Sequence, residues 1–351
     1  MSEAPPSVPA PAKAAPPKQP FSERVAKAVL NLSPKSRMVL LGAGASREAG
    51  FPIATELDHV FRDSDLPIYT VIADALSVGG VDVERVLRLM ELLADHGPDA
   101  VAHDLAQLDL HVGRLMRFAD KRKSLADKLN AEIIRITAIL RDSLWRQPAP
   151  LPSRASATKP PPQPWDYLKP LINAQRGSTV ATLNYDNALE LAGGKAVRTA
   201  KDAAVISVPG LSDSYVRVLK LHGSMDWKRV DDDVTHSPDP FAGIPYEPAI
   251  IFGSGNKLRH YGPFLELLRE FQLALAKADQ LIVIGYGWRD AHINSEIKRW
   301  ARPSNRQKYL KVNVMPGEAQ PRLVSYIESE YRHVMVRVLP RTASEMIPRL
   351  F

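Results

Sequence analysis

Asn184 and Asp186 are the residues of this chain whose types and spacing first suggest chemistry. They share a polar turn that follows the β-branched, apolar residues 179–183 and precedes apolar positions that recur at helical spacing from Ala188. In open α/β sheets, ligands bind at the carboxyl ends of the strands. An Asn amide donates and accepts at once, and Asp accepts from hydroxyls, so together they can orient a sugar or a water. The alternative interpretation is that both residues cap the helix.

His222 forms a second polar turn, after a predicted strand over residues 216–221. Gly223 follows it and leaves room beside the imidazole, and Ser224 adds a hydroxyl. Histidine titrates near neutral pH, which suits a general base that takes a proton from a hydroxyl. The alternative is a histidine whose nitrogens are satisfied by backbone groups at the turn.

Two glycine-rich turns each follow an apolar strand. The first, residues 42–52, comes after Arg37–Leu41, and its glycines let the backbone approach a pyrophosphate at the start of the next helix. Its third glycine arrives later than in G-x-G-x-x-G, and no Lys-Ser/Thr pair follows as in a Walker loop. In the second, residues 285–294, Asp290 suits a helix cap or a ribose ligand, and Trp288 suits an adenine stack or the core. For residues 42–52, the alternative interpretation is a purely structural turn between a strand and a helix.

The elements that must position these turns alternate between strands and helices. Further strands are predicted at residues 249–252, 281–284, 310–314 and 334–339, and helices at Phe264–Lys277 and residues 293–300. This order predicts an α/β fold, a Rossmann-like parallel sheet with helices on both faces. Apolar residues at helical spacing also predict a mostly helical region between the first two motifs, with Val83, Val86, Leu87, Met90 and Leu93 in one helix and Leu125, Leu129, Ile133, Ile136, Leu140 and Leu144 in another.

The organisation follows from composition. Residues 1–20 are rich in Pro and Ala and are predicted to be a disordered tail. Residues 21–351 are predicted to form one catalytic domain with a helical insert at about 56–175, which contains a Pro-rich loop at 147–164.

Composition also excludes several classes of chemistry. The 351 residues contain no cysteine, which removes disulfides, iron–sulfur clusters, thiolate-bound zinc and a thiol nucleophile. No run approaches the roughly 20 apolar residues of a membrane span, and the N-terminus lacks a secretory signal, so we expect a cytoplasmic protein without a membrane partner. The net charge of +7 comes from scattered Lys and Arg residues, so direct nucleic-acid binding is not expected.

Together the four motifs resemble the sirtuin family, whose members bind NAD in a Rossmann-like domain and break its nicotinamide glycosidic bond. Residues 42–46 with 50–52 resemble the sirtuin phosphate turn, residues 182–186 the Asn-Asp turn, and residues 221–224 the catalytic histidine. Residues 285–287 with Asp290 resemble the late glycine turn beside the adenosine half.

Departures from the family pattern narrow the resemblance. Sirtuin deacylases carry a four-cysteine zinc module, which this chain cannot build, so no zinc module and no metal are expected. Residues 53–55 replace the deacylase Asp-Phe-Arg, and Leu183 replaces a Gln. The helical insert, with residues 82–87 and 284–290, resembles the sirtuin-like NAD hydrolases of bacterial antiphage defence. That resemblance implies an NAD-depleting effector of abortive infection that forms a homo-oligomer and has a partner such as a HerA-type ATPase or an Argonaute-related protein.

The resemblance therefore implies an NAD+ glycohydrolase that yields nicotinamide and ADP-ribose. Asn184 would orient the ribose and the attacking water, His222 would act as the base, and Asp186 would support the ribose. The remaining residues expected to bind NAD+ are Gly42, Ala43, Gly44, Ala45, Ser46, Gly50, Phe51, Pro52, Thr182, Gly223, Ser224, Gly285, Tyr286, Gly287 and Asp290. Two alternatives stay open: a zinc-less NAD-dependent deacylase, and a non-catalytic module that senses NAD or ADP-ribose and regulates a partner.

Overall fold

The computed structural model describes residues 36–76, 83–97, 112–119, 124–146, 161–200, 208–231, 233–237, 248–251, 262–302 and 304–351. The chain divides into two units, Met1–Ser33 and Pro34–Phe351, and all described residues belong to the second. The predicted tail at 1–20 and most of the Pro-rich loop at 147–164 lie outside the described residues.

A seven-stranded sheet forms the centre of the second unit, with strand order β10-β9-β8-β1-β2-β4-β3. Every neighbouring pair is parallel, and Val39 in the central strand pairs with Val180 on one side and Ile282 on the other. The strands are β1 (Arg37–Leu41), β2 (Thr179–Thr182), β3 (Val197–Arg198), β4 (Val216–Lys220), β8 (Gln280–Ile284), β9 (Lys308–Val314) and β10 (Val334–Pro340). Because β1 has β2 on one side and β8 on the other, the strand order reverses at β1, where such sheets bind ligands.

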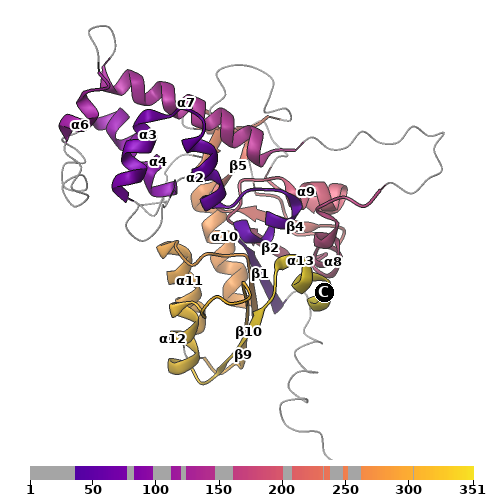
Figure 1. Ribbon diagram of the computed structural model, residues 1–351. Helices are drawn as coiled ribbons and strands as arrows, with labels where there is room; N and C mark the ends of the chain where they lie inside the picture. Colours follow the sequence, from indigo (N-terminus) through magenta and orange to yellow (C-terminus); the bar gives the residue numbers. More distant parts are fainter. Residues whose placement is uncertain are drawn as a thin grey trace, which may run out of the picture. The chain divides into compact units, whose positions relative to one another are not determined.

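Helices cover both faces of this sheet, as the sequence predicts (Figure 1). Side chains alternate across the pleat, so Met38 and Leu40 enter one core cluster while Val39 and Leu41 enter another. The first cluster includes residues of α10 (Phe264–Lys277), α11 (Ala291–Ala301) and α12 (Arg322–Glu330). The second includes residues of α8 (Lys169–Ala174), α9 (Ala188–Gly193) and α13 (Ala343–Leu350). The Rossmann-like fold class is therefore confirmed.

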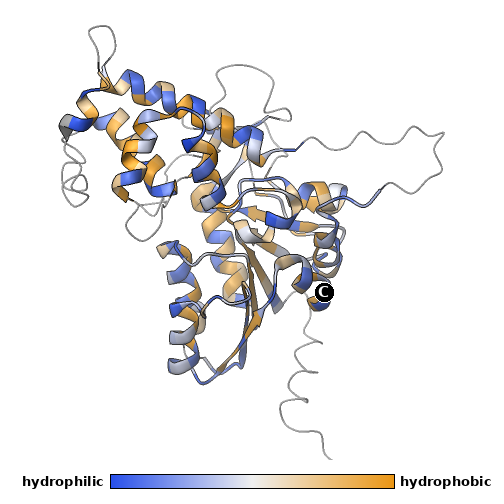
Figure 2. Ribbon diagram, viewed as in Figure 1, coloured by the Kyte–Doolittle hydropathy of each residue, from blue (hydrophilic) through white to orange (hydrophobic). Residues whose placement is uncertain are grey.

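The region between β1 and β2 is helical and has its own core. Its helices are α2 (Ala54–Arg62), α3 (Pro67–Leu76), α4 (Val83–His96), α6 (Val112–Met116) and α7 (Leu125–Leu144). Figure 2 shows apolar and polar positions alternating along these helices. The buried apolar side chains form one cluster that includes Phe61 and Tyr69. The rings of these two residues meet edge to face, with their centroids 5.1 Å apart. No helix among the described residues is both long and apolar enough to cross a membrane.

A second, three-stranded antiparallel sheet corrects the sequence interpretation. It has the order β6-β5-β7, with β5 (Gly223–Val230), β6 (Asp233–His236) and β7 (Pro248–Ile250). The residues after His222 were expected to continue a polar turn, but of residues 223–227 only Gly223 is in a left-handed conformation, with φ of 89°, and the strand begins there. The strand predicted at 249–252 belongs to this sheet and not to the parallel one. The sequence of β5 did not predict a strand, because several of its residues are polar and it lacks a regular alternation of apolar and polar positions. The strand is recognisable only from its pairing with β6 on one side and β7 on the other.

Candidate functional site

The first glycine turn lies directly after β1, at the carboxyl edge of the sheet. It contains two short 3₁₀ helices, Ala43–Ala45 and Arg47–Ala49, and the first α-helix begins only at Ala54. The element that follows the first glycine directly is therefore a short 3₁₀ helix, and the predicted contact of this turn with a pyrophosphate stays a prediction. Ala43 is exposed and Gly44 half-buried, so the backbone of this turn borders the solvent at the strand ends.

The glycines of the first and last motifs pack against each other. Gly42 N donates to Ile284 O and Gly44 N donates to Gly285 O, both at 2.9 Å. A Cβ atom on Gly285, which has a φ of 67°, would lie 2.0 Å from Ala45 N. One on Gly42 would lie 2.6 Å from Gly285 O. The close contact between the turns after β1 and β8 therefore requires glycine at these positions. In the sequence, the same glycines were explained by the approach of a pyrophosphate.

Asn313 holds the Gly285 turn and was missed in the sequence. Its Oδ1 accepts from Gly285 N at 2.6 Å, and its Nδ2 donates to Arg341 O at 3.1 Å. Asn313 is buried near the end of β9, where its neighbours Val312 and Val314 are apolar. A single amide within an apolar strand is the signal that could have identified it.

Ser46, Asn184 and Asp186 form one buried hydrogen-bonded group. Asn184 Nδ2 donates to Ser46 Oγ at 2.9 Å, and Ser46 Oγ donates to Asp186 Oδ1 at 3.2 Å. The same Asp186 oxygen accepts from Ala188 N at 2.9 Å, at the start of α9, although the N-cap position of this helix is Asn187, whose side chain makes no cap hydrogen bond. Asn184 N donates to Thr182 Oγ1 at 3.1 Å, which places the fourth predicted residue in this group.

The Asn184 side chain keeps one polar atom without a partner. It is 8% exposed, and among the described residues its Oδ1 is buried with no hydrogen bond. Since a buried acceptor without a donor costs about 1–3 kcal/mol, this oxygen is suited to a donor from a ligand or a water. Ser46 thus fixes the Asn184 carboxamide through its Nδ2, and the Oδ1 atom remains available to accept a hydrogen bond.

Lys220 fixes the backbone of this turn from the next strand. Its side chain is 1% exposed, and its Nζ donates to Asp186 O at 2.6 Å and contacts Glu190 Oε1 at 3.2 Å. Burial raises the pKa of Asp186, and the Lys220 ammonium opposes part of that rise. Lys220 was not predicted to take part in the site, because a lysine at a strand end usually reaches solvent.

His222 contacts Asp290 across the carboxyl edge. His222 Nε2 lies 2.8 Å from Asp290 Oδ2, and both side chains are 6% exposed. Asp290 Oδ1 accepts from His292 N and Ile293 N, so the predicted cap of α11 is confirmed, while its contact with the histidine was not predicted. A cavity of about 20 Å³ adjoins the pair, which is room for about one water.

Tyr185 lies between the two groups. Its ring centroid is 6.4 Å from that of His222, and its hydroxyl donates to Ile251 O at 2.7 Å. Ile251 N in turn donates to His222 O at 2.9 Å. Burial raises the pKa of Tyr185 well above its ordinary value, so the hydroxyl stays protonated and remains a donor.

The other predicted residues are distributed around these groups. Gly223 begins β5, and Ser224 Oγ donates to Asp226 Oδ1, while the other carboxylate oxygen, Oδ2, lies 3.1 Å from His236 Nε2. The Ser224 hydroxyl is thus engaged within the small sheet, and its predicted contact with NAD+ stays a prediction. Tyr286 OH donates to Asn294 Oδ1 at 3.1 Å, and Gly287 has open space around it.

Arg146 attaches the helical insert to both turns. Its backbone N donates to Asn187 Oδ1 at 3.1 Å, and Asn187 Nδ2 donates to its O at 2.8 Å. Its guanidinium donates to Gly50 O at 3.2 Å and lies 5.2 Å from the centroid of Phe51, which is buried beside Pro52. The predicted residues 50–52 are therefore joined to the insert and to the turn after β2.

A parallel sheet whose strand order reverses at β1, with polar turns at the carboxyl ends of β1, β2, β4 and β8, defines a Rossmann-like α/β protein with a candidate ligand site at its strand ends. A family profile described as the SIR2-like domain matches residues 178–334. Those residues are a SIR2-like domain, and the resemblance to sirtuins is confirmed.

Solved structures of Sir2 homologues resemble the chain more distantly. One, described as a complex with NAD, has 14% identity and a TM-score of 0.42, and the match covers 94% of this chain and 92% of that chain. A point mutant in complex with ADP ribose has 14% identity, a TM-score of 0.46 and coverage of 92% and 94%. A triple mutant with 2'-O-acetyl ADP ribose has 15% identity, a TM-score of 0.44 and coverage of 93% and 94%. No curated protein matches the chain by sequence.

Proposed function

We propose that the chain is an NAD+ glycohydrolase that cleaves NAD+ into nicotinamide and ADP-ribose. The observation that carries the proposal is the pairing, within a SIR2-like domain, of a Ser46-held Asn184 with an Asp290-held His222. Binding alone would not require both an amide with a buried open acceptor and a buried histidine–carboxylate pair. The domain match supports NAD+ as the substrate.

The residues provide what this cleavage requires. Nicotinamide leaves as a neutral molecule when the N-glycosidic bond breaks, so no strong general acid is needed, and the site must stabilise an oxocarbenium-like ribose. Asn184 Oδ1 accepts from a ribose hydroxyl or from the attacking water, while Asp186 supports the sugar. The water oxygen bonds to the ribose carbon, and its proton passes to the base.

His222 serves as that base through its Nδ1. Nε2 lies 2.8 Å from Asp290 Oδ2, so in this proposal the carboxylate orients the imidazole and Nδ1 is the nitrogen that takes the proton. The cavity beside the pair has room for about one water, the acceptor in this proposal. Backbone groups of residues 42–46, with Gly285 and Gly287, would hold the diphosphate and adenosine half.

The decisive experiment incubates the purified full chain with NAD+ alone and identifies the products by chromatography and mass spectrometry. Nicotinamide with ADP-ribose supports the proposal. Nicotinamide that appears only with an acylated peptide, together with O-acyl-ADP-ribose, shows the deacylase instead, and NAD+ binding without products shows the sensing module. A cyclic product or exchange of the base would also replace hydrolysis as the reaction.

Two variants test the residues. Asn184→Ala and His222→Ala are expected to abolish cleavage and to keep the melting temperature near that of the wild type. Asn305→Ala and His59→Ala, which change exposed residues, serve as matched controls. Wild-type nicotinamide release by either site variant would remove that residue from the mechanism.

We further propose that the enzyme is a cytoplasmic NAD-depleting effector of antiphage defence. Its support is the resemblance of the insert and of residues 284–290 to that group, which also suggests a homo-oligomer and an ATPase or Argonaute-related partner. A steep rise of specific activity with protein concentration would support assembly. Unchanged cellular NAD+ during phage infection of cells that carry the intact system would contradict the role.

A further inference from the structure

The basic residues of this chain are scattered along the sequence, but the fold gathers several of them around aromatic rings. Helices α11 and α12 lie side by side on one face of the sheet (Figure 1). The two helices, the C-cap of α11 and the turn after α12 carry the aromatic residues Tyr326, Tyr331 and His333 and the exposed basic residues Lys298, Arg302 and Arg332. We refer to these six residues as the tyrosine patch.

Tyr331 links the three rings of the tyrosine patch. It meets Tyr326 at 89°, with the centroids 6.0 Å apart, and its centroid lies 6.1 Å from that of His333. His333 Nε2 lies 3.2 Å from Arg302 O, which joins the rings to the end of α11. Lys298 Nζ lies 4.6 Å from the centroid of Tyr326, within the range of a cation–π contact. The Tyr326 ring is thus held by two neighbours, and the residue is still 40% exposed.

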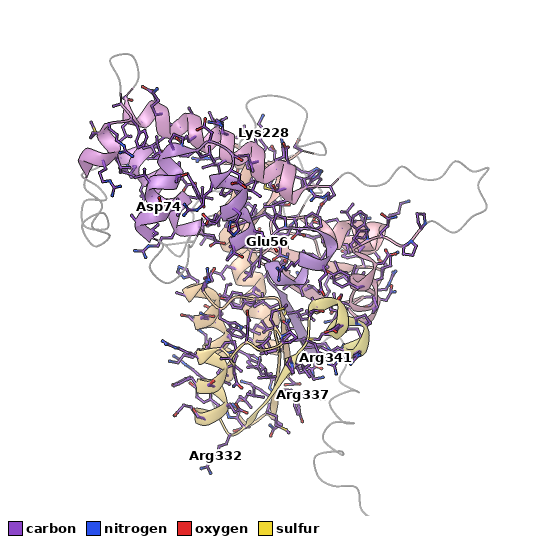
Figure 3. All side chains as sticks on the ribbon, in the orientation of Figure 1. Glu56, Asp74, Lys228, Arg332, Arg337 and Arg341 are labelled. Atoms are coloured by element: carbon purple, nitrogen blue, oxygen red, sulfur yellow. The ribbon has the colours of Figure 1, made fainter. Side chains whose placement is uncertain are left out.

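Cations surround these rings. Burial and the neighbouring Tyr326 raise the pKa of Tyr331, whereas the Arg302 guanidinium lowers it, which places that charge beside the ring. Arg332 follows Tyr331 in the chain, and Figure 3 shows its side chain pointing away from the ribbon. Glu330 is a carboxylate beside Tyr331 and reduces the positive potential in part.

Two further carboxylates on these helices are engaged outside the tyrosine patch. Glu296 Oε2 lies 2.9 Å from Arg299 Nη1, and Glu328 Oε2 accepts from Gln320 Nε2 at 2.9 Å. Their charge is therefore met by groups that do not belong to the patch, and the patch keeps a net positive charge.

We propose that the tyrosine patch binds single-stranded nucleic acid. Surfaces that bind single strands combine aromatic rings, on which bases stack, with Lys and Arg side chains that contact phosphates. The Tyr326 ring is already held by Lys298 and Tyr331, so it loses little conformational freedom when a base stacks on it. A role in core packing would bury this ring, and attraction of an anion by charge alone would not require it. The proposal does not depend on NAD+ cleavage.

Fluorescence anisotropy of the purified full chain with labelled single-stranded DNA of about 12 nucleotides tests this binding. The logarithm of the affinity is expected to fall against the logarithm of the salt concentration with a slope of about −2, which corresponds to about three phosphate contacts. RNA of the same sequence is measured in parallel. Binding of either strand supports the proposal, and the tighter one identifies the ligand.

Two kinds of variant separate stacking from charge. Tyr326→Ala is expected to weaken binding about tenfold or more, the contribution of one stacked base, whereas Tyr326→Phe keeps the ring and the affinity. Lys298→Gln should reduce the magnitude of the salt slope by about 0.7. Lys195→Gln, a change of an exposed lysine close to α9 in the chain, should leave the slope unchanged.

Three comparisons can overturn the proposal. The first is an abasic strand of the same length, the second is duplex DNA, and the third is a polyglutamate peptide, which represents an acidic protein segment. Equal affinity for any of them would mean that the patch attracts anions without stacking bases. A single strand that does not bind, or that binds Tyr326→Ala as tightly as the wild type when both have the same melting temperature, would also refute it.

Discussion

Replacing Lys220 by Met tests whether the buried ammonium positions the turn after β2. Met keeps the length of the apolar stem but removes the donor to Asp186 O and the contact with Glu190. A hydrogen bond from a charged group contributes about 1.5–3 kcal/mol, and Glu190, with 16% of its side chain exposed, regains part of its hydration. We therefore expect the free energy of unfolding to fall by about 2–3 kcal/mol, measured by urea denaturation.

The same change has a second, electrostatic consequence. Burial raises the pKa of Asp186 and Lys220 lowers it, so loss of Lys220 raises the Asp186 pKa further. If NAD+ cleavage needs the ionised carboxylate, the acid limb of the kcat/KM profile moves to higher pH. Displacement of the turn adds a loss of kcat/KM of about 100-fold at its optimum, the size that small misplacements can cause.

Lys195→Met provides the matched control, because Lys195 is an exposed lysine close to α9 in the chain. It should retain the stability, the rate and the pH profile of the wild type. A Lys220→Met protein that loses stability but keeps the wild-type acid limb and kcat/KM would restrict Lys220 to a structural role. Unchanged stability would refute the reasoning entirely.

Three further predictions concern the insert and the glycine contact. Burial raises the pKa of Glu132 above its ordinary value. The stability of the wild type relative to Glu132→Gln should therefore fall as the pH rises through that raised pKa. A difference between the two urea midpoints that is the same at pH 4 and pH 7 would contradict this. Asn187→Ala removes both hydrogen bonds to Arg146 and should cost about 2–3 kcal/mol, measured by denaturation. Gly285→Ala should abolish NAD+ binding in calorimetry, whereas Gly317→Ala, also at positive φ but without a close neighbour, should keep it.

Elements with strong periodicity were predictable from the sequence. Strand β1 and helix α10 have the bounds that the pattern predicts, because their apolar residues repeat without interruption. Strand β5 was missed, since its polar residues pair with each other: Ser224 donates to Asp226, which also contacts His236. Local composition does not reveal the contact of Asp226 with His236, because it forms only when β6 folds back on β5.

The candidate site was predictable as a set of turns but not as a set of contacts. Asn184 and His222 were identified because each follows an apolar strand, and parallel strands bring their carboxyl ends to one edge. The partners that hold them, Ser46 and Asp290, lie far away in the chain, and only the strand order β8-β1-β2-β4 brings them near. Lys220 escaped notice because its burial depends on α9.

The insert contributes directly to the candidate site. Tyr185, between Asn184 and Asp186, packs against the core of the insert, and its hydroxyl lies 3.5 Å from Glu84 Oε1 on α4. Arg146 makes hydrogen bonds to Asn187 in the same turn and to Gly50 in the turn after β1. Since both ends of residues 184–187 are attached to insert residues, a displacement of α4 or of the end of α7 changes the position of the Asn184 amide. A partner that binds the insert would therefore act on the hydrogen bonds that fix this turn, and through them on the proposed NAD+ cleavage, without contacting NAD+.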